Sequence, residues 1–198
     1  MIKQKIVIVG AGIVGASMAY HLAKRNQDVT VIERHPAAAR EVTEKSFAWI
    51  HTTHRVAPDY WHLYDAVLEE YHTLQQELPE LKIHWHGALT WDTPPLREQP
   101  HFQKLNREQL EALEPNLKEY LDEAIFVSEE GAVDPIAVTE LLLSKAQSYG
   151  AKFSSIPTLH SFSKKVPAWS ACIRPTVFWS RMSSYWPQVQ ASPNFATR

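Results

Sequence analysis

The segment from Lys5 to Glu33, KIVIVGAGIVGASMAYHLAKRNQDVTVIE, limits the possible folds more than any other part of the chain. Its first residues, KIVIV, form a β-branched run typical of a strand that is buried on both faces, and a glycine-rich turn follows at once. An amphipathic helix pattern comes next, and DVTVIE returns as a second strand. This order predicts a strand, a helix and a parallel strand, the repeating unit of an α/β fold.

The turn between the first strand and the helix has G-x-G-x-x-G spacing. Gly10 allows the tight turn, Gly12 lets a pyrophosphate approach the backbone, and Gly15 lets the helix pack closely on the strand. Free N–H groups at the helix N-terminus can hold the phosphate groups. The residues expected to contact a bound dinucleotide here are Gly10, Ala11, Gly12, Ile13, Val14 and Gly15.

Glu33 ends the second strand, 18 residues after Gly15. An acid near this distance accepts hydrogen bonds from a ribose diol and would repel a 2′-phosphate. The glycine spacing alone is weak evidence, but here the strand, the helix, the second strand and the acid agree. The segment is therefore predicted to bind the ADP part of a dinucleotide.

Composition narrows the classes of partner. The chain has 198 residues and a net charge of −2, which argues against nucleic acid or an anionic membrane as the main partner. The apolar N-terminal stretch leads straight into the glycine turn, which favours a strand over a signal peptide, and no segment is long enough to span a bilayer. The single cysteine, Cys172, excludes an internal disulfide and fits a cytoplasmic location. Nothing in the sequence predicts an oligomeric state.

Beyond Glu33 the pattern departs from that of a nicotinamide-binding domain, in which another helix and another buried strand would follow. Residues 34–55 form a polar loop without a Val/Ile-rich run, and such a loop can wrap around a cofactor. An amphipathic helix is predicted from Pro58 to Pro79, and its apolar stripe is interpreted as core. The stripe consists of Trp61, Tyr64, Val67, Leu68, Tyr71, Leu74 and Leu78.

The second half of the chain shows shorter signals. Asn106 and Gln109 have the spacing of a capping box, and Gly150 has the position of a helix C-terminal glycine. The elements predicted are a strand over Lys82–Trp91, a helix over Asn106–Leu113, a strand over Ala124–Val127, a turn over Gly131–Pro135, a helix over Ile136–Tyr149 and a strand over Ala151–Ile156.

Five segments, GAGIVGASMAYHLAKRNQDVTVIER, TEKSFAWI, GALTW, LEALEPNL and EEGAVDPIAVTELLLSKAQSYGAKF, occur in this order between about residues 3 and 160. Together they resemble the N-terminal half of the D-amino-acid oxidase, glycine oxidase and sarcosine oxidase family of FAD enzymes. The resemblance implies a Rossmann-like FAD-binding domain, the beginning of an inserted α+β substrate domain, and a missing C-terminal half. It divides the chain into a cofactor unit (1–55), a helical segment with the start of the substrate domain (56–130), a return to the FAD-binding domain (131–165) and an anomalous tail (166–198).

The resemblance also implies roles for particular residues. Gly10, Gly12 and Gly15 would bind the pyrophosphate of FAD, Glu33 the adenosine ribose, and Arg34 would flank the adenine. Thr43 and Ser46 stand where the family's hydroxyl loop passes near the pyrophosphate and flavin, with Phe47 and Ala48 close behind. Many relatives carry a more glycine-rich sequence in place of REVTEKS.

The implied reaction is hydride transfer from the Cα–H of an amine or amino acid to FAD, which gives an imine. The residues that select the substrate lie mostly in the family's C-terminal half, so no catalytic residue is assigned. Two other readings stay open: an inactive FAD-binding fragment of such an enzyme, and an NAD-dependent dehydrogenase. The loop after Glu33 disfavours the dehydrogenase.

The histidines give weaker signals. His84 and His86 flank Trp85 in strand alternation and would share one face, but no third ligand completes a metal set, and no metal site is predicted. His51 and His54 follow SFAWI and could approach the flavin, although loop histidines more often lie on the surface. The chain has no G-x-S-x-G motif to support a hydrolase.

The tail from Val166 to Arg198 has no Gly, Asp or Glu, and it shows neither helical nor strand periodicity. Synonymous codons chosen for this tail and read two bases later encode a string that contains DVVVLAAGAGVAKL, which looks like the missing family segment. We therefore hypothesise a slipped reading frame near Lys164 to Val166, with a divergent tail as the alternative.

Overall fold

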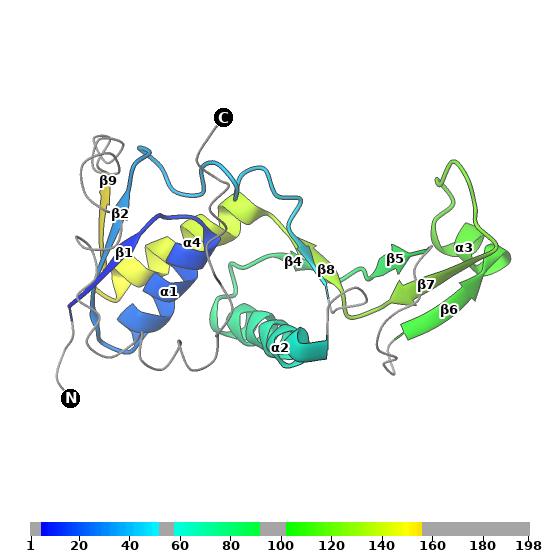
Figure 1. Ribbon diagram of the computed structural model, residues 1–198, viewed down its shortest axis with the longest axis horizontal. Coiled ribbons are helices and arrows are strands. Elements are labelled where there is room, and N and C mark those ends of the chain that lie inside the picture. The colour runs from blue at the N-terminus through cyan, green and yellow to red at the C-terminus, as the bar shows by residue number, and fades with distance from the viewer. Residues whose placement is uncertain (1–4, 52–57, 92–101, 156–198) are drawn as a thin grey trace, which may run out of the picture. The chain divides into compact units, whose positions relative to one another are not determined.

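The computed structural model describes residues 5–51, 58–91 and 102–155, so His54 and the predictions for the tail lie outside the described residues. In Figure 1 the chain begins with β1 (Lys5–Val9), α1 (Ile13–Lys24) and β2 (Asp28–Glu33). There follow β3 (Trp49–Ile50), the short 3-10 helix η1 (Pro58–Tyr60), α2 (Trp61–Glu77), β4 (Ile83–His84), β5 (Ala88–Thr90), β6 (Phe102–Asn106), α3 (Arg107–Leu113), β7 (Glu123–Val127), β8 (Gly131–Val133), α4 (Pro135–Ser148) and β9 (Lys152–Ser155).

The parallel sheet has the order β1-β2-β9. β2 pairs with β1 from Asp28 to Ile32 and with β9 from Thr30 to Glu33, so the last described strand lies beside one of the first. α1 and α4 pack against each other beside this sheet (Figure 1). The strand, helix and strand predicted from the glycine turn are confirmed, as are the helix before Gly150 and the strand after it.

Small side chains let α1 approach its neighbours closely. Ala16 and Ala19 are completely buried, and Tyr20 is the largest buried side chain of the helix. α4 begins at a strong cap, because the Asp134 carboxylate accepts hydrogen bonds from the N–H groups of Ile136 (2.8 Å) and Ala137 (2.9 Å). The buried side chains of this core include Ile8, Val29, Val31, Val138, Leu142 and Ala146.

Two small antiparallel sheets have the orders β3-β8-β4 and β5-β7-β6. The predicted turn over Gly131–Pro135 is wrong in its first half, because Ala132 of β8 pairs with Trp49 on one side and His84 on the other. The single strand predicted over Lys82–Trp91 is also wrong. It breaks into β4 and β5 at Gly87, whose φ of +77° ends the extended run.

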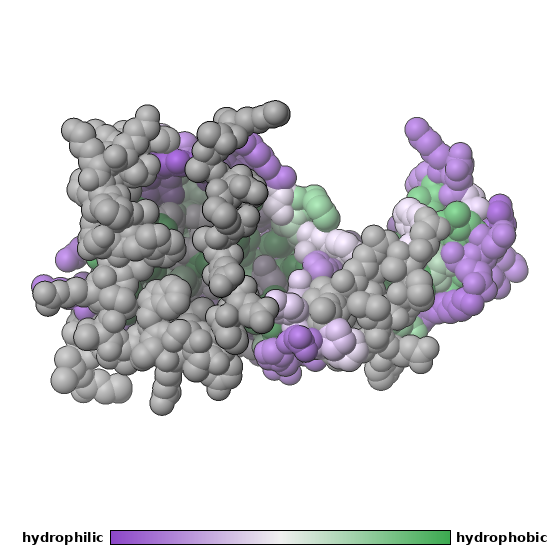
Figure 2. Space-filling view, viewed as in Figure 1, coloured by the Kyte–Doolittle hydropathy of each residue, from purple (hydrophilic) through white to green (hydrophobic). Residues whose placement is uncertain are grey.

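The strand predicted over Ala124–Val127 is confirmed as β7, and the predicted capping box opens α3. The Asn106 side chain accepts from the Gln109 N–H, and the Gln109 side chain accepts from the Asn106 N–H, both at 2.9 Å. Figure 2 shows hydrophilic side chains over β6, β7 and α3, where an ion pair joins Lys104 to Glu123.

α2 corrects the interpretation of its apolar stripe as core. Leu74 and Leu78 at its C-terminal end are buried, whereas Leu63 and Val67 are 49% and 42% exposed. The C-terminal end is tied to α1, since the Tyr20 hydroxyl donates to a Glu77 carboxylate oxygen (2.8 Å). The N-terminal half of the stripe instead faces a cavity.

Candidate functional site

The glycine turn brings the end of β1 directly under the start of α1. The Gly10 N–H donates to the Ile32 carbonyl (2.8 Å), and the φ of Gly10 is +100°. A Cβ atom on Gly15 would lie 2.0 Å from the Gly10 carbonyl oxygen. The close packing of helix on turn therefore requires glycine at position 15, as the spacing predicts.

Glu33 ties the end of β2 to this turn. One of its carboxylate oxygens accepts from the Ala11 N–H (2.7 Å) and the other from the His35 N–H (2.9 Å), and the residue is only 8% exposed. Burial acts to raise the pKa of this carboxyl, but the N–H groups of Ala11, His35 and Arg34 outweigh it and hold the pKa below its usual value. A buried anion thus stands at the end of β2, beside the glycine turn.

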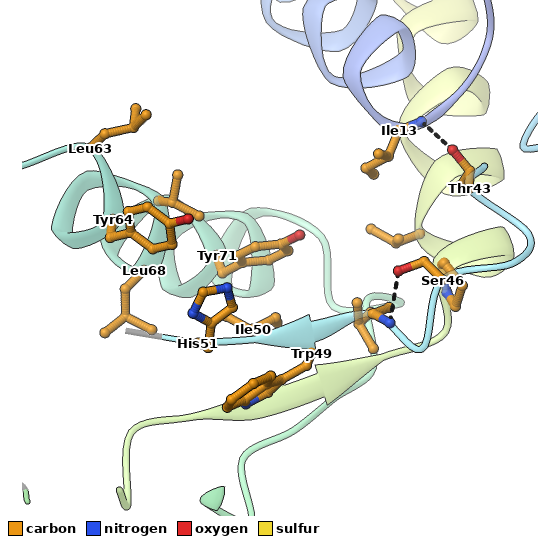
Figure 3. A pocket seen from close by; sticks show the side chains of 15 residues that line it. Ile13, Thr43, Ser46, Trp49, Ile50, His51, Leu63, Tyr64, Leu68 and Tyr71 are labelled. Atoms are coloured by element: carbon orange, nitrogen blue, oxygen red, sulfur yellow. Dashed lines mark hydrogen bonds between the residues drawn. The ribbon is translucent and has the colours of Figure 1, made fainter. Parts of the chain in front are cut away.

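The loop after β2 folds back over the turn. The Ala39 N–H donates to the Ala11 carbonyl (2.9 Å), and the Thr43 hydroxyl accepts from the Ile13 N–H (3.2 Å) at the start of α1 (Figure 3). Thr43 is 8% exposed, and a Cβ atom on Gly12 would lie 2.9 Å from its hydroxyl oxygen. The structure therefore brings Thr43 to the helix N-terminus, next to Gly12.

Charged groups near the start of this loop form a cluster. Glu41 accepts hydrogen bonds from the Arg34 guanidinium and from the His35 ring (3.0 Å), and the Arg34 bond, followed by the His35 bond, lowers the pKa of Glu41. The backbone is left-handed at Ala39, Glu41 and Ala48, with φ between 51° and 71°. Such strain in non-glycine residues is concentrated at functional sites in many proteins. Glycines in the relatives' version of this loop would adopt these angles without strain.

Beside the N-terminus of α1 lies a cavity of about 420 Å³. Figure 3 shows side chains of β3 and α2 lining it, with Thr43 and Ile13 at one end. Its walls are mainly apolar and aromatic. The lining residues are Ile13, Thr43, Ser46, Ala48, Trp49, Ile50, His51, Leu63, Tyr64, Val67, Leu68, Tyr71, Val133, Pro135 and Val138.

Several residues singled out from the sequence occupy different positions relative to this cavity. Ser46 lines it and accepts from the Ala48 N–H (3.0 Å), and His51 lines it with its ring 5.2 Å from that of Tyr64. Phe47 is 82% exposed and is not among the lining residues, although its ring stacks on Trp49 with the centroids 6.3 Å apart. Val14 is 71% exposed on α1.

Sequence reasoning missed the aromatic wall of the cavity. Trp49 comes from β3, and Tyr64 and Tyr71 come from α2. The signal that could have found Trp49 is the SFAWI segment itself, in which an extended stretch directly after the hydroxyl loop must carry side chains toward the cofactor. The two tyrosines belong to the stripe interpreted as core.

The histidine pair on β4 shares one face, as predicted, with ring centroids 5.7 Å apart. Within residues 5–51, 58–91 and 102–155, no group of three or more His, Cys, Asp or Glu side chains is placed to hold a metal ion. Over the same ranges, no helix has the length and apolar character needed to cross a bilayer.

Comparisons with known proteins agree with this geometry. In a curated D-amino acid dehydrogenase of Rhizobium johnstonii, 39 residues are 51% identical, which is 20% of this chain and 9% of the dehydrogenase. Glycine oxidase from Geobacillus kaustophilus superposes with a TM-score of 0.66 at 19% identity, and this likeness concerns the fold alone. Iminodiacetate oxidase from Chelativorans sp. BNC1 superposes with a TM-score of 0.61 at 27% identity.

The superpositions cover 78% of this chain and 47% of the glycine oxidase, and 76% of this chain and 46% of the iminodiacetate oxidase. The chain thus spans less than half the length of these enzymes. The family model of FAD-dependent oxidoreductases of the DAO type matches residues 5–165, which include the glycine turn, the loop over it and the lining of the cavity. This chain belongs to the DAO family of FAD-dependent oxidoreductases.

Proposed function

We propose that residues 5–155 form the FAD-binding part of an enzyme that oxidises an amine or an amino acid. One observation carries this proposal: Ile13 and Thr43 are joined by a hydrogen bond at the N-terminus of α1 and also line the 420 Å³ cavity. The phosphate-binding turn and the cavity are therefore continuous. An elongated cofactor can extend from Glu33, across Gly12 and into the cavity.

The groups present fit the parts of FAD in that order. The Glu33 carboxylate is a hydrogen-bond acceptor suited to a ribose diol, and Arg34 beside it would flank the adenine. The N–H groups at the start of α1, with Gly10, Gly12 and Gly15 in the turn, would hold the pyrophosphate. The apolar and aromatic walls of the cavity suit a planar ring system and would exclude water from it.

Bound FAD would supply the redox chemistry, the acceptance of a hydride from the Cα–H of the substrate. The residues described here bind and orient; we assign none of them a catalytic role. An amine or amino-acid substrate is supported by the names of the relatives, which include a D-amino acid dehydrogenase, a glycine oxidase and an iminodiacetate oxidase. We propose that the substrate-selecting residues lie in the part of those enzymes that this chain does not match.

Ligand titration of the purified chain tests the cofactor. We expect calorimetry to show binding of ADP and tighter binding of FAD, and we expect the chain desalted after incubation with FAD to retain a flavin absorption spectrum. Glu33→Ala should weaken both ligands, whereas Glu69→Ala, at an exposed position of α2, should not. Tighter binding of NAD than of FAD, or no binding of either, would contradict the proposal.

Anaerobic reduction separates an active enzyme from an inactive fragment. With FAD bound, D-amino acids, glycine and iminodiacetate are added in turn and the flavin band is followed. Bleaching of the band by one of them supports amine oxidation by this chain. Stable FAD binding without bleaching by any of them would instead support the FAD-binding fragment.

A further inference from the structure

A fully buried carboxylate stands behind the cavity wall. Glu130, between β7 and β8, has no exposed surface. It accepts a hydrogen bond of 2.8 Å from the indole Nε1–H of Trp49, a residue 81 positions earlier in the chain. Burying a carboxylate costs free energy unless hydrogen bonds compensate for its lost hydration. The Trp49 indole is one of the groups that provide this compensation.

The backbone around Trp49 gives the side chain little support. β3 is only two residues long and pairs with β8 at Ala132 and Gly131. Ala48, just before it, is left-handed with a φ of 51°. The strand is thus a short extended piece that follows a strained residue. A side-chain bond across 81 residues therefore adds a constraint that the two paired residues of β3 do not provide.

Glu130 itself is held in place from another direction. Its carbonyl oxygen accepts from the Gly87 N–H (2.9 Å), and its own N–H donates to the Val127 carbonyl (3.4 Å). A Cβ atom on the next residue, Gly131, would lie 2.8 Å from the Trp85 ring. The carboxylate is therefore presented from a crowded turn, and it can act as a fixed anchor for the indole.

We propose that Glu130 is a positioning residue, which holds Trp49 in the cavity wall and thereby sets the fit of the flavin ring. This inference rests on the proposed function, because it needs the flavin to enter the cavity. Trp49 lines the cavity together with His51, whose ring centroid is 4.8 Å from that of the indole. Glu33 and the glycine turn, which would bind ADP, do not contact Glu130 in any hydrogen bond described above. Loss of the anchor should therefore affect the flavin end of the cofactor and spare the ADP end.

The experiment compares FAD with ADP in variants of Glu130. Glu130→Gln keeps an oxygen that can accept from the indole, and it should bind both ligands like the wild type. Glu130→Met removes the acceptor and should weaken FAD about ten-fold, the size expected for the loss of a hydrogen bond to a charged group, with ADP unchanged within about two-fold. Glu129→Met, at the exposed neighbouring position, is the matched control and should change neither.

Two further measurements report on the indole directly. In amide and indole NMR spectra, the Trp49 Nε1–H signal, assigned by its loss in Trp49→Phe, should exchange slowly with solvent in the wild type and in Glu130→Gln. Flavin fluorescence, which a nearby indole quenches, should rise in Trp49→Phe while ADP affinity stays the same. Trp49→Phe keeps an aromatic ring and provides the test if Glu130→Met does not fold.

The outcomes separate the two proposals. If the wild type binds FAD and ADP and the folded Glu130→Met protein binds FAD equally well, Glu130 has no positioning role and the proposed function stands. Equal weakening of FAD and ADP would also overturn the positioning role, since it would show a general structural effect. If the wild type binds neither ligand, the proposed function fails, and this inference fails with it.

Discussion

At the scale of single residues, Glu33 shows how one carboxylate can serve folding before it serves a ligand. Its two oxygens already accept hydrogen bonds from Ala11 and His35, so the glycine turn and the end of β2 are joined without a cofactor. We expect the same carboxylate to accept the ribose hydroxyls through its remaining lone pairs. Its substitution should therefore affect stability as well as binding.

This dual role gives a pH prediction. Because the folded-state pKa of Glu33 is lowered, its ionised form stabilises the fold above the usual glutamate pKa of about 4.3, and the contribution is lost as the pH falls through the lower folded-state value. Glu33→Gln should lower the free energy of unfolding by about 1–2 kcal/mol at pH 7. In urea titrations the gap to the wild type should narrow below pH 4. A gap that stays constant from pH 7 to pH 3 would contradict the role of the charge, and Glu69→Gln should show no gap.

Thr43 gives a second prediction at this scale. Its hydroxyl caps the Ile13 N–H, so Thr43→Val should destabilise the fold by about 1 kcal/mol, as the loss of other hydroxyl caps does. Thr43→Ser keeps the hydroxyl and should retain most of the stability. Urea unfolding without ligand measures both variants. Equal destabilisation by valine and serine would show that the methyl group and its packing matter, and that the hydrogen bond does not.

At the scale of elements, α4 owes its start to Asp134 and its place to its buried face. Asp134→Ala leaves the N–H groups of Ile136 and Ala137 without their acceptor and should cost about 1 kcal/mol, while Asp134→Ser should recover part of this loss. Urea unfolding followed by far-ultraviolet circular dichroism measures the difference. The matched control is Gln147→Ala, at an exposed position near the other end of α4. No loss in Asp134→Ala would mean that packing alone defines this helix.

The elements also show how far the sequence alone can lead. β1, α1, β2, α3 and α4 were predictable because each carries its own local signal: a β-branched run, a glycine turn, a capping box or a cap followed by a periodic stripe. β3 and β8 were not, because they are short and exist only through pairing with each other and with β4. The cavity wall was missed for a related reason. An apolar stripe on α2 looks the same whether it faces a core or a cofactor.

The candidate site divides in the same way. The turn and Glu33 could be predicted because their spacing along the chain reflects their geometry. The contact of Thr43 with Ile13, across 30 positions, was suggested only by family resemblance. The Trp49–Glu130 bond, across 81 positions, left no mark in the sequence pattern, because a pair of distant polar residues has no periodicity.

At the scale of the whole molecule, the parallel sheet carries an unusual exposed edge. Among the described residues β1 pairs only with β2, and Val7 and Val9 are 50% and 55% exposed. Strands of parallel sheets are ordinarily buried on both faces, and an open apolar edge promotes association. Val7→Lys should therefore reduce light scattering at high protein concentration without loss of stability. Val42→Lys, the same change in an exposed loop, is the control and should leave scattering unchanged.

The pairing of β9 with β2 has a consequence for the order in which the protein can fold. Thr30 and Glu33 find their partners only at Lys152 and Ser155. During synthesis the first two strands and α1 must wait, without their third strand and without α4, until residue 155 has left the ribosome. Contacts so distant in sequence form slowly, and apolar surface stays uncovered in the meantime. The nascent chain is thus most vulnerable to chaperone capture and proteolysis while the residues of the cavity wall are being made.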